Sequence, residues 1–306
     1  MIETDNILIG VDAGGTKTRL LVKGSTQAST RLHQGKGINL KRDGISGAAA
    51  QLAALINLAT VDHTDSAPLF LCAGIAGAGR QSDRQNLEQE LSSLLRPRSL
   101  STTICTDADI AYYAAHEDNP GILIIAGTGS IILAKTVQGD FVRAGGWGYK
   151  LGDEAGGYQL GQAGLSAVAN HMDGGPPTML TALIEKSLQI SGADELISFT
   201  YDPETRIQDV APLVLTAAQQ EDQIAMSIVD RQLDLLATRL RWMVTSNAGV
   251  NPNVCIFGGL SGHPYYLERL KARLTKVAPD ISFSPMQLSP VEAALRLASK
   301  MVDKHL

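Results

Sequence analysis

A strand, a glycine-rich turn and a second strand occur in the same order twice along the chain, and this repeat limits the fold more than any other feature. The first copy covers residues 6–23 with its turn at 13–15, and the second covers 122–135 with its turn at 127–130. An internal repeat is the usual sign of a duplicated architecture. We therefore expect two domains of similar topology, each opening with a β-hairpin.

Between the two hairpins, short apolar strands alternate with amphipathic helices. The expected strands cover residues 28–33, 68–73 and 99–105, and the expected helices cover 45–59 and 82–96. Ser82 is the expected N-cap of the second of these helices. Three clustered strands followed by alternating helices and strands indicate an α/β domain with a mixed sheet.

The second half of the chain is richer in helices. A long amphipathic helix is expected over 221–248, and a strand over 253–257 leads into the glycine loop 258–262. The last helix is expected to begin at Pro290, because Ser289 before it is a suitable cap and proline is favoured at the first helical position. The second domain is thus also expected to be of the α/β class.

The boundary between the domains is set by the repeat alone, because no linker, charge block or low-complexity stretch interrupts the chain. We place it near residue 118, which gives an N-terminal domain over 1–118 and a C-terminal domain over 119–306. Whether the last helix, 290–304, packs back on the N-terminal domain stays open at this point.

The charge balance argues against polyanionic partners. Of 306 residues, 26 are Lys or Arg and 31 are Asp or Glu, which gives a net charge of -5. A weakly acidic protein has no general attraction for nucleic acid or an anionic membrane. Negatively charged ligands must therefore be held by local devices such as backbone amides, helix ends or metal ions.

Cysteine usage and hydropathy indicate a soluble cytoplasmic protein. Cys72, Cys105 and Cys255 are far apart and outside any CxxC motif, so neither a disulfide framework nor a cysteine metal site is expected. The opening stretch MIETDNILIG is too short and too acidic for a signal peptide. No apolar run approaches the ~18 residues of a membrane span.

The glycine turns predict a phosphate site that is not one of the common nucleotide motifs. Gly10 and Gly15 have P-loop spacing, but Thr16 stands where a P-loop needs lysine, and a strand follows where a helix should. No GxGxxG motif is present. Consecutive amides in a glycine turn can bind an anion, and Thr16, Thr128 and Ser130 would add hydroxyl donors. Plain tight turns are the alternative interpretation.

Five polar or aromatic residues near these segments are candidates for catalytic or ligand-binding roles. Asp12 ends the first strand, where a carboxylate can hold a hydrated metal ion beside phosphates. Asp107 follows a strand, and its alternative role is helix capping. Asp153 and Glu154 are expected to begin a helix, where the helix dipole favours acids. Trp147 lies among glycines and is expected to face a ligand or the other domain.

Five motifs occur in order over most of the chain. They are GVDAGGTKTR at 10–19, TDAD at 106–109, AGTGSI at 126–131, AGGWGYKLGDEAGG at 144–157 and FGGLSG at 257–262. Together they resemble the N-acetylglucosamine kinase and glucosamine kinase group of the BadF/BadG/BcrA/BcrD-type ATPase family, within the sugar kinase–hsp70–actin superfamily; the fourth motif is the specific one. The resemblance implies an α/β fold of two ribonuclease H-like, actin-like ATPase domains with a nucleotide and sugar cleft between them.

The resemblance also implies roles for individual residues. Asp107 would be the catalytic base and a sugar contact, and Asp12 would hold Mg²⁺ through water. ATP would be bound by Gly14, Gly15, Thr16, Lys17, Gly127, Thr128, Gly129, Ala218, Gly258 and Gly259. The sugar would also be bound by Asn39, Gly146, Trp147 and Asp153. One departure is Ile131, which stands where the vertebrate enzyme has asparagine and which bears on how the substituent at C2 is held.

The implied activity is phosphorylation of an amino sugar at its 6-hydroxyl, with ATP and Mg²⁺. N-acetylglucosamine is the first candidate and glucosamine the next, followed by glucose or a sugar of the N-acetylmuramic acid type. An activator ATPase of a dehydratase or reductase would need clustered cysteines, and a sugar-responsive repressor would need a DNA-binding domain before the first hairpin. The resemblance suggests a homodimer, and neither a nucleic acid nor a membrane partner is expected.

Overall fold

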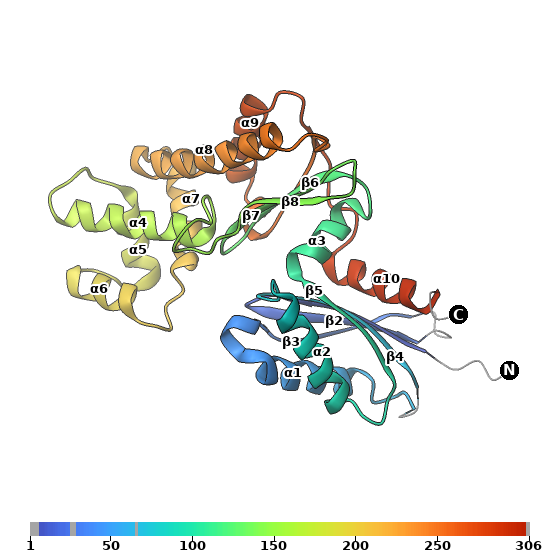
Figure 1. The fold of residues 1–306 in the computed structure, drawn as a ribbon. Helices are drawn as coiled ribbons and strands as arrows, with labels where there is room; N and C mark the ends of the chain where they lie inside the picture. Colours follow the sequence, from blue (N-terminus) through green and yellow to red (C-terminus); the bar gives the residue numbers. More distant parts are fainter. Residues whose placement is uncertain (1–5, 25–28, 65–66, 304–306) are drawn as a thin grey trace. The chain divides into compact units, whose positions relative to one another are not determined.

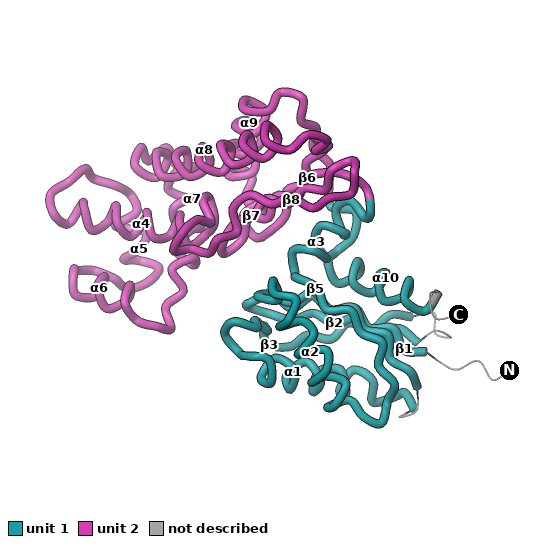
Figure 2. Tube along the Cα trace, viewed as in Figure 1, with its two compact units in different colours: residues 1–118, 286–306 teal, residues 119–285 magenta. Residues whose placement is uncertain are grey.

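The structure is a computed structural model, and it describes residues 6–24, 29–64 and 67–303. The chain divides into two compact units, which Figure 2 shows in different colours. Unit 1 comprises residues 1–118 and 286–306, and unit 2 comprises residues 119–285. The stretch expected to form one C-terminal domain, 119–306, is therefore divided at Pro285, and the last helix lies with unit 1.

Each unit is built on a five-stranded mixed sheet, and the two sheets follow one plan. The strand order is β3-β2-β1-β4-β5 in unit 1 and β8-β7-β6-β9-β10 in unit 2. In both sheets, three strands pair antiparallel in sequence order and two further strands add in parallel beside the first. The bounds are β1 (Ile7–Ala13), β2 (Lys17–Gly24), β3 (Arg31–Lys36), β4 (Leu69–Ile75), β5 (Leu100–Thr106), β6 (Gly121–Ala126), β7 (Ser130–Lys135), β8 (Phe141–Gly145), β9 (Asn253–Phe257) and β10 (Ser282–Phe283). The predicted α/β class with mixed sheets is confirmed.

Helices cover both faces of the unit 1 sheet, as Figure 1 shows. One face carries α1 (Leu40–Ala59) and α2 (Gln81–Leu94), and the other carries α3 (Asp107–His116) and α10 (Pro290–Asp303). Neighbouring side chains of a strand point to opposite faces. In β4, Leu71 and Ala73 accordingly join the core under α1 and α2, whereas Cys72 joins the smaller cluster under α3 and α10.

Helix α10 lies directly on β1 because Gly10 has no side chain. A Cβ at residue 10 would lie 2.6 Å from the Cα of Leu295, so any larger residue would push the helix away. The start of α10 matches the sequence-based prediction. The Ser289 hydroxyl donates to the Glu292 carboxylate at 2.6 Å, and the Ser289 N–H donates to the same oxygen at 2.8 Å.

Unit 2 has one large core formed by its sheet and helices. The helices are α4 (Gly157–Met172), α5 (Met179–Leu188), α6 (Ala193–Tyr201), α7 (Ala211–Gln219), α8 (Gln223–Ser246) and α9 (Pro264–Val277), with short 3₁₀ turns at Ile207–Val210 and Gly259–Gly262. The apolar stripe predicted for the long helix is buried along α8 at Val229, Leu233, Leu236, Leu240 and Met243. Among the described residues, none of the helices combines the length and the apolar character needed to cross a bilayer.

Two local predictions were wrong. Helix α2 begins at Gln81, so Ser82 lies inside its first turn, and the residue at the cap position is Arg80, which makes no side-chain cap. Asp153 and Glu154 do not begin a helix, because α4 starts only at Gly157 and the backbone of Asp153 is left-handed, with φ of 62°. Residues 28 and 304, at the ends of two expected elements, lie outside the described residues.

The cap of α10 provides a stability prediction. We expect Ser289→Ala to lower the free energy of unfolding by about 1 kcal/mol, because it removes the hydroxyl that binds Glu292 at the start of the helix. Ser82→Ala is the matched control, since Ser82 is an exposed residue inside α2 and caps nothing. Urea titrations followed by circular dichroism should separate the two variants, and equal stabilities would contradict the capping role.

Candidate active site

Two carboxylates, Asp12 and Asp107, lie at one edge of the unit 1 sheet. Strand β1 runs parallel to β4, and β4 runs parallel to β5, so the carboxyl ends of all three strands reach the same edge. Asp12 is the second-last residue of β1, and Asp107 directly follows β5 as the first residue of α3. The sheet therefore brings together two acids that are far apart in sequence.

The surroundings of Asp107 favour its neutral form. Burial raises the pKa of Asp107 to about 6, the backbone N–H of Ala108 opposes the rise, and the negative charge of Asp12 adds to it. Burial also raises the pKa of Asp12, although the charges of Arg19 and Lys17 act in the other direction. A carboxyl group whose pKa lies this close to neutral is well suited to general acid–base work.

Capping of α3 does not depend on Asp107. The cap is formed by Thr106, whose hydroxyl accepts the Asp109 N–H at 3.0 Å, while the Asp109 carboxylate accepts the Thr106 N–H at 2.9 Å. This reciprocal pair is a capping box. The alternative role considered for Asp107 is therefore filled by its neighbours, and the Asp107 carboxylate accepts the N–H of Ala108 at 3.0 Å.

The first hairpin turn presents exposed backbone amides beside Asp12. The N–H of Gly14 closes the turn by donating to the carbonyl of Lys17 at 3.1 Å. Gly15 and Thr16 are exposed, and within the described chain their N–H groups have no protein acceptor. Adjacent unpaired N–H groups of this kind can bind an anion.

Asn39 lies near this turn but already has a structural task. It is the N-cap of α1: its side-chain oxygen accepts the Lys41 N–H at 2.9 Å, and its own N–H donates to the Asp43 carboxylate at 2.8 Å. A sugar contact at Asn39, which the sequence suggested, would thus come from a side chain whose position is fixed by the start of a helix.

The second hairpin turn is held by the beginning of α4. The carbonyl of Gly127 accepts the Gly157 N–H at 2.8 Å, and the carbonyl of Thr128 accepts the Tyr158 N–H at 2.9 Å. Within the turn, the N–H of Gly127 donates to the Gly129 carbonyl at 2.9 Å. The turn is therefore fixed by backbone groups of a helix end, and the Thr128 side chain remains exposed.

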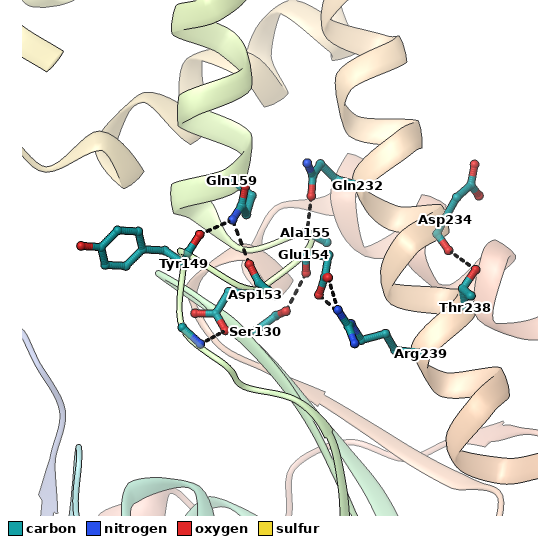
Figure 3. Close-up of polar contacts among 12 residues, drawn as sticks. Ser130, Tyr149, Asp153, Glu154, Ala155, Gln159, Gln232, Asp234, Thr238 and Arg239 are labelled. Carbon is teal, nitrogen blue, oxygen red and sulfur yellow. Dashed lines mark hydrogen bonds and ion pairs between the residues drawn. The ribbon is translucent and has the colours of Figure 1, made fainter. Parts of the chain in front are cut away.

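A network of side chains fixes the loop that connects β8 to α4 (Figure 3). The Gln159 amide donates to the carbonyls of Tyr149 and Gly152 at 2.7 and 2.8 Å. The Ser130 hydroxyl donates to the Glu154 carbonyl at 2.6 Å, and the Ala155 N–H donates to the Gln232 side chain at 3.0 Å. These contacts hold the loop in place without a regular secondary structure.

This loop places Asp153 against the second hairpin. A Cβ on Gly129 would collide with the Asp153 carboxylate, so glycine is needed there for the close approach. The carboxylate accepts the Gly148 N–H at 3.1 Å. Burial raises the pKa of Asp153, the Gly148 N–H opposes the rise, and the negative charge of Glu154 adds to it. The Asp153 carboxylate therefore lies next to the second hairpin turn, which is a candidate phosphate site, within unit 2.

Glu154 has a different role from its neighbour. Burial acts to raise the pKa of Glu154, but the hydrogen bonds and positive charge of Arg239 outweigh it and lower the pKa. The guanidinium of Arg239, on α8, binds the carboxylate through two nitrogens, with Nε at 2.8 Å from Oε2. Sequence reasoning missed Arg239 and Gln159, because their partners are set only by the packing of α4 and α8.

Trp147 is exposed on the same loop, with 58% of its surface accessible. The Arg143 guanidinium lies over its indole ring, 4.5 Å from the ring centroid. The indole thus has a large open surface within unit 2, as a ligand-facing residue would. Trp242, on α8, is similarly exposed at 55%, so exposure alone does not distinguish the two tryptophans.

The glycine loop after β9 lies beside the second hairpin, whereas Ala218 lies away from any surface. Gly258 has φ of 116°, and a Cβ there would collide with the Ala126 carbonyl at the end of β6. A Cβ on Gly259 would meet no described atom within 4 Å, which leaves room above this residue. Ala218 is 1% exposed in the core of unit 2, so its side chain offers no surface to the nucleotide contact suggested by the sequence.

The chain is similar to two curated proteins that are named as sugar kinases. The chain is 32% identical over 238 residues to an N-acetyl-D-glucosamine kinase of Dictyostelium discoideum, which covers 73% of this chain and 74% of the relative. It is 29% identical over 210 residues to an N-acetylmuramic acid/N-acetylglucosamine kinase of Clostridium acetobutylicum, covering 67% and 68%.

A solved structure from Chromobacterium violaceum, provisionally described as an N-acetylglucosamine kinase, is also similar. It superposes with a TM-score of 0.77 at 25% identity, covering 96% of this chain and 99% of that one. A model of the BadF/BadG/BcrA/BcrD ATPase family matches residues 9–292, which include both hairpin turns, the two acids and the glycine loop after β9. The chain belongs to the BadF/BadG/BcrA/BcrD ATPase family.

Proposed function

We propose that the protein transfers the γ-phosphoryl group of ATP to the 6-hydroxyl of an amino sugar, with N-acetylglucosamine as the first candidate. The observation that carries the proposal is the carboxyl of Asp107, which stands at a sheet edge beside Asp12 and the first hairpin with a pKa raised to about 6. The relatives from Dictyostelium and Clostridium, both named as kinases of N-acetylated sugars, support the choice of substrate.

Asp107 is the group that would accept the proton in this reaction. As the 6-oxygen forms its bond to the γ-phosphorus, the bond from phosphorus to the β–γ bridging oxygen breaks, ADP leaves, and the hydroxyl proton passes to the Asp107 carboxylate. General-base help of this kind is worth roughly 10²–10⁴-fold in rate. The rest of the catalysis would be positioning and neutralisation of charge, as is usual for phosphoryl transfer.

The two hairpins would bind the phosphates. Each presents backbone amides and an exposed threonine, Thr16 in unit 1 and Thr128 in unit 2. Gly258 and Gly259 would adjoin the adenosine, and Asn39, Gly146, Trp147 and Asp153 would contact the sugar. Lys17, also exposed, would add a positive charge next to the first hairpin.

The acids of unit 1 fit a magnesium ion. Mg²⁺ prefers oxygen ligands and is usually held by one or two carboxylates together with phosphates and water. In the part of the chain that the structure describes, no group of three His, Cys, Asp or Glu side chains could hold a metal by itself. Asp12, with one partly buried carboxylate beside the hairpin, suits an ion that arrives with ATP, and such an ion would neutralise the phosphate charge.

A panel of sugars tests the substrate directly. We expect ATP-dependent ADP release with N-acetylglucosamine, and weaker turnover with glucosamine, N-acetylmuramic acid, N-acetylmannosamine and glucose. The matched control is 6-deoxy-N-acetylglucosamine, which keeps the ring and the acetamido group but lacks the acceptor oxygen. Turnover of the 6-deoxy sugar would contradict the assignment of the 6-hydroxyl, and preference for glucosamine would favour the second candidate.

Replacement of Asp107 tests the proposed base. Asp107→Asn should lower kcat at least about 100-fold while ATP and sugar still bind, because the amide keeps the shape of the carboxylate but cannot take the proton. Asp109→Asn, two residues along the same helix, is the control and should change kcat only a few-fold, since Asp109 serves the cap of α3. If both variants lose the same activity, the carboxylate of Asp107 has no special role.

The pH dependence of kcat/KM should show the ionisation of Asp107. A base acts only when it is deprotonated, and burial raises the pKa of Asp107 to about 6, so kcat/KM should rise as the pH increases through about 6 and then level off. Both substrates are kept far below their KM values so that the free enzyme is observed. The residual activity of Asp107→Asn controls for the ionisation of ATP itself, and an identical rise in that variant would contradict the assignment.

A further inference from the structure

The two hairpin turns occupy the same place in their sheets but differ in length by one residue. Residues 14–17 lie between the paired residues Ala13 and Thr18 of the first hairpin, and residues 127–129 lie between the paired residues Ala126 and Ser130 of the second. In each, the first residue donates its N–H back to a carbonyl near the end of the turn. At the tip of the second turn, the Thr128 carbonyl accepts the Tyr158 N–H at 2.9 Å.

At the tip of the first turn, the Gly15 carbonyl is bound by a side chain, that of Arg42. The Arg42 Nη1 donates to the Gly15 carbonyl at 2.8 Å, and Nη2 donates to the Gly37 carbonyl at 2.5 Å. Nε and Nη2 also bind the two carboxylate oxygens of Asp43 at 2.7 and 2.9 Å. One guanidinium thus connects the turn, the strand exit at Gly37 and the first turn of α1.

Because the peptide group is planar, the contact of Arg42 with the Gly15 carbonyl also sets the direction of the Thr16 N–H. The C=O and N–H of a trans peptide point in opposite directions, so fixing the Gly15 carbonyl also fixes the N–H of Thr16 on the far side. Without that contact the peptide could rotate easily, because glycine restricts its backbone less than any other residue. The backbone of Gly37 is in close contact with the turn: a Cβ there would collide with the Gly15 carbonyl.

We propose that Arg42 is a positioning residue of the phosphate site, which holds the Gly15–Thr16 peptide so that the Thr16 N–H is presented to the nucleotide. It acts through the backbone, since its guanidinium is already bound to two carbonyls and a carboxylate. A planar guanidinium can bind several acceptors at once in fixed directions, whereas a lysine ammonium on its flexible stem cannot reproduce that fork. The inference rests on the proposed function in one respect, that the ligand of the turn is ATP.

Steady-state kinetics of Arg42→Gln, Arg42→Lys and Arg31→Gln test the proposal. Arg31 is the matched control, because it lies on β3 of the same unit and forms an exposed ion pair with Asp62 at 2.5 Å. Arg42→Gln should raise the KM for ATP about tenfold, the loss expected for roughly one hydrogen bond to a charged ligand, and should change the KM for the sugar much less. Arg42→Lys should fall between Arg42→Gln and the wild type, and Arg31→Gln should match the wild type.

Amide hydrogen exchange provides a readout that does not need turnover. In the wild type, the non-hydrolysable analogue AMPPNP should protect the peptide 13–20, and in Arg42→Gln this protection should be largely lost while the unfolding temperature stays close to that of Arg31→Gln. If Arg42→Gln does not fold, Arg42→Lys is judged by the same two measurements.

The outcomes separate the two proposals. An unchanged KM for ATP in Arg42→Gln, an equal rise in both KM values, or protection as strong as in the wild type would each overturn the role of Arg42. A wild-type protein that phosphorylates none of the sugars, yet loses AMPPNP protection in Arg42→Gln, would overturn the proposed substrate and leave the role of Arg42 standing.

Discussion

Parallel strand pairing decides where the chemistry of unit 1 can be. Because β1, β4 and β5 run in the same direction, their carboxyl ends meet at one edge, and Asp12 and Asp107 arrive there together with the first hairpin. The edge is partly buried, so charge is costly, and the pKa of each acid is raised. The same plan recurs in unit 2, where the hairpin, the Asp153 loop and the glycine loop after β9 lie around the end of β6.

Features governed by local pattern could be predicted from the sequence. The two hairpins, the buried stripe of α8 and the cap at Ser289 each depend on residues within a few positions of one another, and the structure has all three. The family resemblance rests on such local motifs too, and the match to the family model over 9–292 confirms it.

Features governed by distant packing could not be predicted in this way. Asp153 and Ala155 have left-handed backbones, with φ of 62° and 63°, which are uncommon for residues other than glycine. Ala155 is held by Gln232 on α8 and Tyr266 on α9, and nothing near it in sequence reveals these partners. For the same reason the expected helix start at Asp153 was wrong, and Arg42, Gln159 and Arg239 were not singled out.

Both units have a hairpin turn at the same place in the sheet, but the contacts that stabilise the turn differ between them. In unit 2 the turn is held by backbone amides of α4, which are present whatever the side chains are. In unit 1 the Gly15 carbonyl at the tip of the turn is bound by the side chain of Arg42. Substitution at a single codon can therefore loosen the first turn, whereas the second can be loosened only by disturbing the start of a helix.

The division of unit 1 between two stretches of chain has a consequence for its biosynthesis. Helix α10, which lies on β1 at Gly10, is translated only after the whole of unit 2. Until then, Cys72 on the sheet and Ile110 on α3 lack the helix that buries them in the finished protein. The core of unit 2 can therefore form before that of unit 1 is complete. During this time, unit 1 exposes an apolar surface that chaperones or neighbouring nascent chains can bind.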